Sequence, residues 1–469
     1  MLDFIKIIEE FGNMTAFKSL AGKDSFELSY NEYLKEVSFC AYNLNRTFGD
    51  LRGRHIGLLC ESNIDYTIIM LALVFSRAVV IPINSYESTD NISHIINDSE
   101  TEAIIIDKEY QEKISIDVPQ YNKATLLVHS NLMTLTDFSE DEADNPLFII
   151  YTSGTTSLSK GVVLTVANQF GVKKQIINSD FMGGPDALPG MKIYNNFPFY
   201  HVAGIVALLG SLECGCTLYL SANPKNILFD LDGESIDVGF ATPAVLKLWK
   251  KAIKRGNTSR LGGLNLVATA GAKIDRETVD AFLNNGIRFC QFYGMTETGG
   301  NVTCNFDIGN HIESVGLPIP GVNLFIQDEE ICISGQQIMQ GYYNNYKETD
   351  KCLRGGVIHT GDLGYIDQDG YVYITGRKKN LIILSSGENV SPEELEKMLY
   401  KCDSIVECKV YESIDRIVAG VFAPKEYHED IREYVSDLNK TLPLYKRIHN
   451  IEFTTEEFEK TASGKIKRH

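Results

Sequence analysis

The sequence predicts an α/β protein with a large amino-terminal domain, built from two parallel-rich α/β sheets and a small β-barrel, and a smaller α+β carboxy-terminal domain. Strand-like and helix-like segments alternate from His55 to Asp107 and again from Lys192 to Phe292, which indicates βαβ crossovers in parallel sheets covered by helices. After Gly299, short alternating strands predominate, as in an antiparallel barrel or sheet. A chain of 469 residues is also too long for one hydrophobic core.

The first run of alternation divides into short apolar strands and helices. The expected strands are His55 to Cys60, Val79 to Ile83 and Ala103 to Ile106, and the expected helices are Asn63 to Arg77 and Asn91 to Asn97. The alternation resumes through Lys192 to Pro198, Val202 to Ser211, Thr217 to Leu220, Asp237 to Phe240, Pro243 to Ala252, Leu264 to Ala268, Asp275 to Asn284 and Ile287 to Phe292.

The last third of the chain has a different pattern. Short strands are expected within Gly321 to Tyr343 and Gly364 to Thr375. Ser391 and Pro392, with Glu394 three residues after the serine, predict a helix start with a capping box. From there to the end of the chain we expect a compact α+β domain.

Composition excludes several classes of protein. With 44% hydrophobic and 23% charged residues, the chain is typical of a globular protein, and its net charge of -18 argues against nucleic-acid or anionic-membrane binding. Met1 to Lys18 is expected to be a surface helix rather than a signal peptide. The most apolar segments, Thr67 to Ile83 and Val202 to Leu220, are interrupted by Arg77 and Glu213, so we expect no membrane span.

The ten cysteines are scattered along the chain. The close pair Cys214 and Cys216 lacks the spacing and the histidine partner of a zinc site. A reduced, cytoplasmic protein is therefore expected.

A loop rich in hydroxyl side chains follows the apolar strand that begins at Phe148. Gly154 allows backbone N–H groups to approach an anion closely, and Lys160 adds a positive charge. The hydroxyl donors are Thr152, Ser153, Thr155 and Thr156. A Walker A loop is excluded, because Ser159 precedes Lys160 and Gly161 follows it. The pattern predicts a phosphate site, with a polar surface loop as the alternative.

Two further candidate stretches follow predicted strands. His201 lies between a strand and an apolar helix, where a histidine contacts a ligand or, more often, serves as a hydrogen-bonded structural residue. Gly271, Ala272 and Lys273 follow another strand, and the small residues there allow a flat ligand to pass the backbone. A tight turn is the alternative reading of that stretch.

The stretch Tyr293-Gly294-Met295-Thr296-Glu297 is more specific. It lies at the carboxyl end of a presumed parallel strand, where open α/β sheets hold ligands. Tyr293 can stack on a base, and Glu297 can bind Mg²⁺ through oxygen.

Charged residues flank a predicted hairpin further along. Asp362 can accept two ribose hydroxyls, and Arg377 can donate to the same sugar or to phosphate, although each alone is also an ordinary turn residue. Lys465 lies in a Ser-Gly loop near the end of the chain. Such a lysine is usually solvated, unless a moving domain brings it to a reaction centre.

Taken together, these motifs resemble the adenylate-forming enzymes, which include acyl- and aryl-CoA synthetases, adenylation domains of nonribosomal peptide synthetases, and firefly luciferase. The resemblance covers nearly the whole chain, and the Tyr-Gly-Met-Thr-Glu and Thr-Gly-Asp motifs with Gly-Arg-Lys-Lys are jointly specific. It implies an amino-terminal adenylation domain over residues 1–377 and a mobile carboxy-terminal domain over residues 378–469 that rotates between half-reactions.

The resemblance also implies a role for each motif. Thr152 to Thr156 and Lys160 would hold the β- and γ-phosphates of ATP, and Gly271, Ala272 and Lys273 would line the adenine and acyl pocket with His201. Tyr293, with Gly294 and Met295, would contact adenine. Thr296 would contact the α-phosphate, and Glu297 would bind Mg²⁺. Asp362 and Arg377 would hold the ribose. Lys379 matches the hinge and Lys465 the lysine that bridges the acyl carboxylate and the α-phosphate.

Two positions depart from the family pattern. The usual glycine and proline of the phosphate loop are Ser157 and Ser159 here, which loosens the turn and favours weaker binding of the phosphates. Of the His-x-Asn arrangement that commonly follows the loop, only Asn168 is kept.

The resemblance implies ATP-dependent activation of a carboxylic acid followed by transfer to a thiol. The stretch around His201 lacks the aspartate that pairs with an α-ammonium, which favours an aliphatic, aryl or cyclic acid without an α-amine. Coenzyme A is the expected acceptor, with the phosphopantetheine of an acyl carrier protein as the alternative. A non-catalytic nucleotide-binding regulator is the alternative of another class. A monomer or a homodimer is expected.

Overall fold

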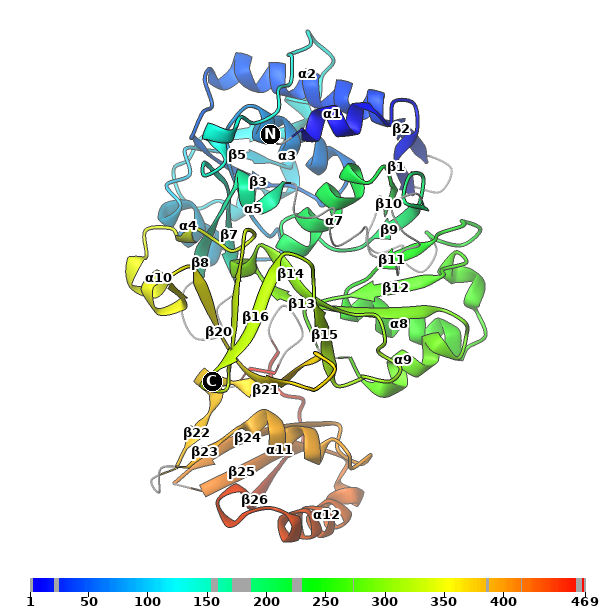
Figure 1. Cartoon of the computed structure of the whole chain (residues 1–469), viewed down its shortest axis with the longest axis vertical. Helices are drawn as coiled ribbons and strands as arrows, with labels where there is room; N and C mark the ends of the chain where they lie inside the picture. The colour runs from blue at the N-terminus through cyan, green and yellow to red at the C-terminus, as the bar shows by residue number, and fades with distance from the viewer. Residues whose placement is uncertain are drawn as a thin grey trace. The chain divides into compact units, whose positions relative to one another are not determined.

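The computed structural model describes residues 3–20, 25–152, 159–170, 187–221, 230–272, 274–384, 388–414, 416–460 and 466–467. Some of the predicted site residues lie outside these ranges, namely Ser153 to Ser157, Lys273 and Lys465. The described residues form two compact units (Figure 1). The first unit comprises Met1–Ser153, Leu158–Leu324 and Ile333–Ile358, and the second comprises Phe325–Cys332 and His359–His469.

The larger sheet of the first unit is parallel at its centre and antiparallel at its ends. Its strands lie in the order β15 (Ser314–Pro318), β14 (Gly300–Asn305), β13 (Arg288–Met295), β12 (Leu266–Thr269), β11 (Val238–Phe240), β9 (Lys192–Asn195), β10 (Thr217–Ser221), β1 (Thr15–Leu20) and β2 (Phe26–Ser29). The strands from β13 to β1 pair in parallel, whereas β14, β15 and β2 are antiparallel. The carboxyl ends of the parallel strands therefore share one edge.

The second sheet of this unit is also mixed. Its order is β18 (Gly341–Tyr342), β8 (Lys160–Thr165), β7 (Pro146–Thr152), β4 (Val79–Pro82), β3 (His55–Leu59), β5 (Ala103–Ile106) and β6 (Gln120–Asn122). The strands from β7 to β6 are parallel, and β8 and β18 pair antiparallel.

The two-residue strand β19 (Leu353–Arg354) belongs to neither of these strand orders. It pairs with the start of β20 (Val357–Ile366).

Helices supply the crossovers that parallel strands require. They are α1 (Phe4–Glu9), α2 (Tyr30–Phe48), α3 (Ile64–Phe75), α4 (Thr89–Asp98), α5 (Val166–Gln169), α7 (Val202–Glu213), α8 (Pro243–Lys254), α9 (Arg276–Leu283) and α10 (Tyr346–Cys352), with 3₁₀ turns at Lys108–Lys113, Lys123–Thr125, Glu140–Glu142, Thr258–Leu261 and η9 (Thr296–Thr298). In Figure 1, α8 and α9 lie together beside β11 and β12. Trp249 and Phe282 from these helices are fully buried in a core with Phe289 of β13.

The second unit combines a hairpin with a small α+β layer. The neighbouring strands β16 (Val322–Gln327), β17 (Glu330–Gly335), β20 and β21 (Val372–Arg377) lie in that order. They lead through η10 (Lys378–Asn380) to β22 (Ile382–Ile383), β23 (Asn389–Val390), α11 (Pro392–Leu399), β24 (Glu407–Ser413), β25 (Arg416–Phe422), a 3₁₀ turn (Lys425–Tyr427), α12 (His428–Thr441), a 3₁₀ turn (Leu444–Lys446) and β26 (Ile448–Thr454). Leu395 of α11 and Ile431 of α12 are buried against β25 in a separate core.

Most of the expected elements are present, and the mixed α/β class with a large first and a smaller second domain is confirmed. Ala103–Ile106 is β5 with the expected bounds, and α3 and α4 lie where helices were expected. The sheets are mixed rather than purely parallel. The domain boundary at residues 377 and 378 stays a prediction.

Two local expectations are wrong. The helix expected from Met1 to Lys18 spans only Phe4–Glu9, and β1 begins at Thr15, where the chain pairs in parallel with β10 and antiparallel with β2. Ser391 caps α11 as expected, but the reciprocal half of the box is absent. The Glu394 carboxylate instead accepts hydrogen bonds from Lys446 Nζ at 2.7 and 2.9 Å.

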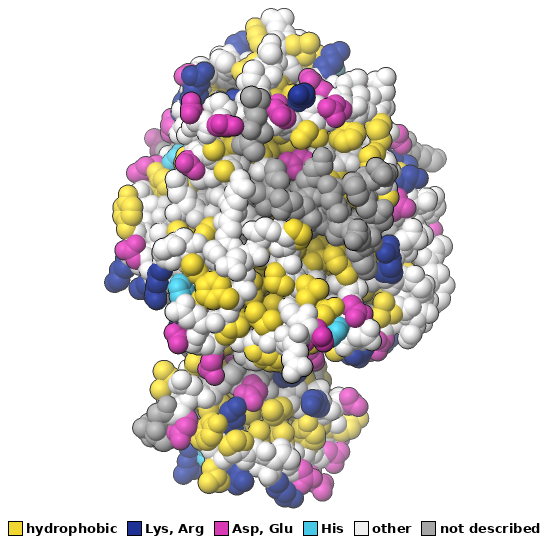
Figure 2. Space-filling view, viewed as in Figure 1, with side chains coloured by type: hydrophobic (Ala, Val, Ile, Leu, Met, Phe, Trp, Pro, Cys, Tyr) yellow, Lys and Arg dark blue, Asp and Glu magenta, His cyan; other side chains and the backbone are white. Residues whose placement is uncertain are grey.

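Charged side chains of both signs are interspersed on the face shown in Figure 2. Among the described residues, no helix is long and apolar enough to cross a membrane. All ten cysteines are free thiols.

Candidate functional site

Two of the predicted stretches lie at the carboxyl edge of the larger sheet. β12 ends at Thr269, and Gly271 follows with a φ of 88°, a value that glycine adopts readily. The carbonyl oxygen of Ala272 accepts a hydrogen bond from Gln291 Nε2 at 3.1 Å, which holds this turn beside β13. Gly271 and Ala272 thus neighbour the strand that carries Tyr293.

β13 ends in the Tyr-Gly-Met-Thr-Glu stretch. The register against β14 shifts between Tyr293 and Gly294, and a Cβ at Gly294 would lie 2.1 Å from the carbonyl oxygen of Gly300. Glycine is therefore required at this position on steric grounds. The shift places Thr296 and Glu297 in η9, where both are largely buried.

Glu297 has a hydroxyl partner that the sequence analysis did not identify. The Tyr342 hydroxyl donates to Glu297 Oε1 at 2.7 Å, and the backbone N–H of Met339 donates to the Glu297 carbonyl at 2.8 Å. Burial, followed by the nearby negative charge of Glu297, raises the pKa of Tyr342 well above its ordinary value. Tyr342 is therefore a neutral donor that fixes the carboxylate.

The candidate phosphate-loop lysine belongs to the same cluster. Lys160 and Thr152 are Cα partners on β8 and β7, so both ends of the loop meet across one strand pair. The Lys160 ammonium lies 5.1 Å from the centre of the Tyr342 ring and is paired with Glu348. The hydrogen bond from Lys160 is the largest cause that lowers the pKa of Glu348 to about 2.

Tyr342 thus connects Lys160 to Glu297, which lie far apart in the sequence. Tyr342 pairs with Val162 on β8, so β18 brings it beside the lysine. A local signal for Tyr342 exists in the Gly341-Tyr342-Tyr343 stretch, where aromatics follow a glycine within a predicted strand region. No sequence pattern indicates that Glu348 would pair with Lys160.

The cluster fits a magnesium ion bound mainly by its nucleotide. Mg²⁺ is commonly held by one or two carboxylates together with substrate phosphates and water. Within the described ranges, no group of three or more His, Cys, Asp or Glu side chains could hold a metal. Glu297, held by Tyr342, is our candidate carboxylate for this ion, because Glu348 in the same cluster is already paired with Lys160.

His201 is the N-cap of α7. Its Nδ1 accepts the backbone N–H of Ala203 at 3.2 Å, so the ring carries its proton on Nε2 when it is neutral. A Cβ at Gly204 would lie 2.1 Å from the carbonyl oxygen of Pro198, so the start of α7 packs directly on the preceding backbone. The His201 side chain is exposed at the surface. The protein atoms around the ring nevertheless remove part of its hydration, and this desolvation lowers the pKa of His201.

The apolar residues that follow His201 face the protein core. Ile205, Val206 and Leu208 are all buried in α7. Their burial assigns these three side chains to packing within the protein core.

Asp362 and Arg377 are brought together in the second unit. They are Cα partners on β20 and β21, and Arg377 Nε lies 2.7 Å from Asp362 Oδ1. The predicted hairpin is thus present, and it places a carboxylate beside a guanidinium at one end. Lys379 lies two residues beyond Arg377, exposed in η10.

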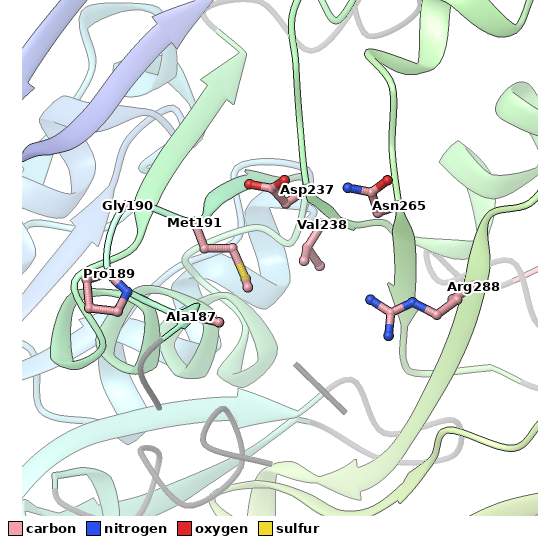
Figure 3. Close-up of a pocket in the computed structure, with 8 residues that line it drawn as sticks. All are labelled: Ala187, Pro189, Gly190, Met191, Asp237, Val238, Asn265 and Arg288. Atoms are coloured by element: carbon pink, nitrogen blue, oxygen red, sulfur yellow. The ribbon is translucent and has the colours of Figure 1, made fainter. Parts of the chain in front are cut away.

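A pocket of about 290 Å³ lies away from all of these residues. It is at the amino ends of β9, β11, β12 and β13, where Asp237, Asn265 and Arg288 approach it (Figure 3). Asp237 Oδ2 accepts the backbone N–H of Lys192 at 2.9 Å, so this carboxylate is engaged in holding neighbouring strands. The candidate site is at the opposite edge of the same sheet.

Comparisons with known proteins agree with the motifs. The chain matches the family model of AMP-binding enzymes over residues 5–343 and that of the AMP-binding enzyme C-terminal domain over residues 394–465. It is 27% identical to a 2-succinylbenzoate–CoA ligase of Bacillus cereus (strain Q1), covering 92% of this chain and 91% of the relative. It is also 27% identical to a feruloyl-CoA synthase of Amycolatopsis sp, covering 94% and 92%.

Solved structures share the fold. The o-succinylbenzoate CoA synthetase (MenE) from Bacillus subtilis, in complex with the acyl-adenylate intermediate OSB-AMP, superposes with a TM-score of 0.84 at 19% identity, covering 100% of this chain and 97% of that one. ATP-bound MatB from Rhodopseudomonas palustris gives 0.85 at 22% identity, with coverage of 100% and 97%.

The fold and both family matches define an enzyme of the adenylate-forming superfamily. More particularly, the chain belongs to the family of AMP-binding enzymes. The expectation drawn from the sequence motifs is thereby confirmed for the family, whereas the roles of individual residues stay predictions.

Proposed function

We propose that this protein is an AMP-forming acid–thiol ligase, which activates a carboxylic acid with ATP and transfers the acyl group to coenzyme A. One observation carries the proposal: Tyr342 joins the Lys160 ammonium and the Glu297 carboxylate in one cluster within the first unit. A cation and a metal-binding carboxylate held together are what a magnesium nucleotide requires. The relatives named as CoA ligases support the same reaction.

In the first half-reaction, an oxygen of the acid attacks the α-phosphorus of ATP and the bond to pyrophosphate breaks. The attacking group is already an anion at neutral pH, so no general base is needed. The barrier is largely repulsion between two anions, and the protein lowers it by placing positive charge and hydroxyl donors around them. When bound, Mg²⁺ supplies further charge neutralisation.

We propose a part in this step for five residues of the candidate site and for Lys465, which lies outside the described residues. Lys160 and Thr152 bind the leaving phosphates, and Thr296 donates to the α-phosphate. Glu297 holds Mg²⁺, while Tyr342 keeps its carboxylate oriented through the 2.7 Å hydrogen bond. Lys465 is proposed to bridge the acid and the α-phosphate.

The nucleoside and acid contacts complete the proposed site. Tyr293, with Gly294 and Met295, contacts adenine, and Asp362 and Arg377 bind the ribose hydroxyls. Gly271 and His201 face the acid, and Ala272 and Lys273 contribute to the adenine and acyl pocket. An acid without an α-amine is proposed, because no carboxylate accompanies His201 in its stretch.

In the second half-reaction, a thiolate sulfur attacks the acyl carbon and AMP leaves. We propose that residues 378–469 rotate about Lys379 to admit the thiol after adenylation. A cytoplasmic location and action as a monomer or homodimer complete the proposal. An acyl carrier protein is the alternative acceptor for the same chemistry.

The test is pyrophosphate exchange followed by thioester analysis. Purified protein with Mg²⁺ and ATP is expected to exchange labelled pyrophosphate into ATP with at least one acid among 2-succinylbenzoate, ferulate, malonate and a series of fatty acids. Addition of coenzyme A should then yield the matching thioester and AMP, detected by mass spectrometry. Absence of exchange with a broad panel of acids would overturn the proposal, and exchange without transfer to coenzyme A would favour the carrier protein.

A further inference from the structure

Glu330 is a buried carboxylate that none of the roles above uses. It is the first residue of β17, and only 6% of it is exposed. Removing a carboxylate from water is costly unless hydrogen bonds and charges compensate it. Its partners therefore indicate what it does.

The two oxygens of Glu330 serve different segments of the second unit. Oε1 accepts the backbone N–H of Gly361 in β20 at 2.8 Å, and Oε2 accepts from Lys378 Nζ in η10 at 2.9 Å. His359 Nδ1 lies 3.6 Å from Oε2. Burial opposes ionisation of Glu330, but Lys378 and the Gly361 N–H outweigh it and lower its pKa. One ionised carboxylate therefore connects β17 to two other segments.

The first of these segments is the part of β20 that presents Asp362. Gly361 has a φ of 73°, and the N–H of Asp362 donates to Thr360 Oγ1 at 3.0 Å. Arg377 Nη1 donates to the carbonyl of Thr360 at 3.1 Å. The direction of the Asp362 carboxylate thus depends on the backbone at Thr360 and Gly361, and Glu330 holds this backbone at Gly361 from the side of β17.

The second segment is the start of η10. Lys378 lies between Arg377, which is paired with Asp362, and Lys379. Glu330 reaches past β20 to this lysine, because β20 is the strand between β17 and β21. The Lys378 side chain is more than half exposed, so the buried carboxylate is the fixed member of the pair.

We propose that Glu330 is a positioning residue that couples the ribose-binding segment of β20 to the hinge segment, with Oε1 setting the geometry at Asp362 and Oε2 anchoring Lys378. The inference rests on the proposed function, since it assigns ribose binding to Asp362 and the pivot to Lys379. Glu330 itself touches no substrate in this scheme. Its two oxygens act on two different steps of the reaction.

Substitution can separate the two oxygens. Glu330→Gln keeps an acceptor for the Gly361 N–H but has no charge for Lys378, so adenylation and the KM for ATP should stay within about twofold of wild type. Thioester formation from preformed acyl-adenylate should fall about fivefold, because the pivot loses its anchor. Glu330→Ala removes both contacts and should also raise the KM for ATP about tenfold.

Lys378→Met tests the same anchor from the other side. It should slow thioester formation as Glu330→Gln does, and the double variant should be no slower than either single variant. Glu394→Gln is the matched control, because it removes the Glu394–Lys446 pair of the same unit and should leave both half-reactions unchanged. Thermal unfolding of each variant checks that it is folded.

The outcomes separate the inference from the proposed function. A wild-type protein that neither exchanges pyrophosphate nor forms a thioester overturns the proposed function itself. An active wild type whose Glu330→Gln and Lys378→Met variants slow both half-reactions equally, or neither, overturns the coupling alone. Equal kinetics for Glu330→Gln and Glu330→Ala would overturn the separate roles of the two oxygens.

Discussion

The Tyr342 hydroxyl contacts Glu297 Oε1 at 2.7 Å, while the same ring lies beneath the Lys160 ammonium. One side chain therefore positions two opposite charges. The hydroxyl acts on the carboxylate and the ring face on the cation, so the two effects can be separated by removing one oxygen atom.

Tyr342→Phe should keep the ring but lose the hydrogen bond to Glu297. We expect the Mg²⁺ concentration for half-maximal pyrophosphate exchange to rise about fivefold, because a hydrogen bond to a charged group is lost. Calorimetric binding of the Mg²⁺–ATP complex should weaken by a similar factor. Tyr346→Phe is the control, since Tyr346 is 82% exposed; equal effects of the two substitutions would contradict the role of Tyr342.

His201 provides a test by pH. Desolvation by the surrounding protein lowers its pKa, so the folded state favours the neutral ring relative to the unfolded chain, whose histidine titrates at about 6.5. The stabilisation from this preference is present above that pH and is lost as the pH falls through the lowered pKa. Protonation of Nδ1 would also remove the cap on Ala203.

His201→Asn should reduce the loss of stability in acid. Asparagine caps helices well but does not titrate, so the apparent Tm of the variant should fall less between pH 7 and pH 5 than that of wild type. The exposed His449, changed to asparagine, is the control and should follow wild type. An unchanged slope in His201→Asn would show that the ring does not titrate differently in the folded state.

At the scale of elements, η10 is the three-residue turn that joins the β20–β21 hairpin to the carboxy-terminal layer. The Ser391 hydroxyl donates to the carbonyl of Thr375 at 3.1 Å, and Asn380 Nδ2 donates to Glu393 Oε1 at 2.6 Å. Contacts thus hold the chain on both sides of Lys379, which concentrates any rotation in the turn itself.

Lys379→Pro should spare adenylation and block thioester formation. Proline fixes φ at about -65°. A hinge that must change its backbone angles for the domain to rotate can then no longer do so. The two half-reactions are measured separately, by pyrophosphate exchange and by release of AMP from supplied acyl-adenylate. Lys379→Ala, which keeps backbone freedom, should perform both, and a proline variant that does the same would remove the hinge assignment.

Across the whole molecule, local pattern predicted the elements better than the contacts between them. The four apolar residues of Ala103–Ile106 match β5 because a fully buried parallel strand is a continuous apolar run. The start of the chain was mispredicted, because Thr15–Leu20 becomes a strand through its pairing with β10, which lies about 200 residues away in the sequence.

The same distinction holds for the candidate site, where residues in local motifs were predicted and their long-range contacts were not. Motifs located Glu297, Asp362 and Arg377, and the structure places the last two in contact. Tyr342, Glu348 and Glu330 were not predicted, since each acts through a partner far away in sequence. Gly341 and the aromatic residues after it mark the position of Tyr342, but no local pattern shows which residue any of the three side chains will contact. Tertiary pairing of strands, which sequence patterns specify only weakly, creates these contacts.

The close approach of Gly294 to Gly300 has a consequence for how variation in this family is interpreted. A side chain at residue 294 would collide with the neighbouring strand's backbone, 2.1 Å from its Cβ, whether or not any nucleotide is present. Intolerance of substitution there reports the packing of a hairpin and carries no information about chemistry. Evolutionary constancy within one short motif can therefore have two unrelated origins, a steric one at the glycine and the proposed binding of Mg²⁺ at the glutamate.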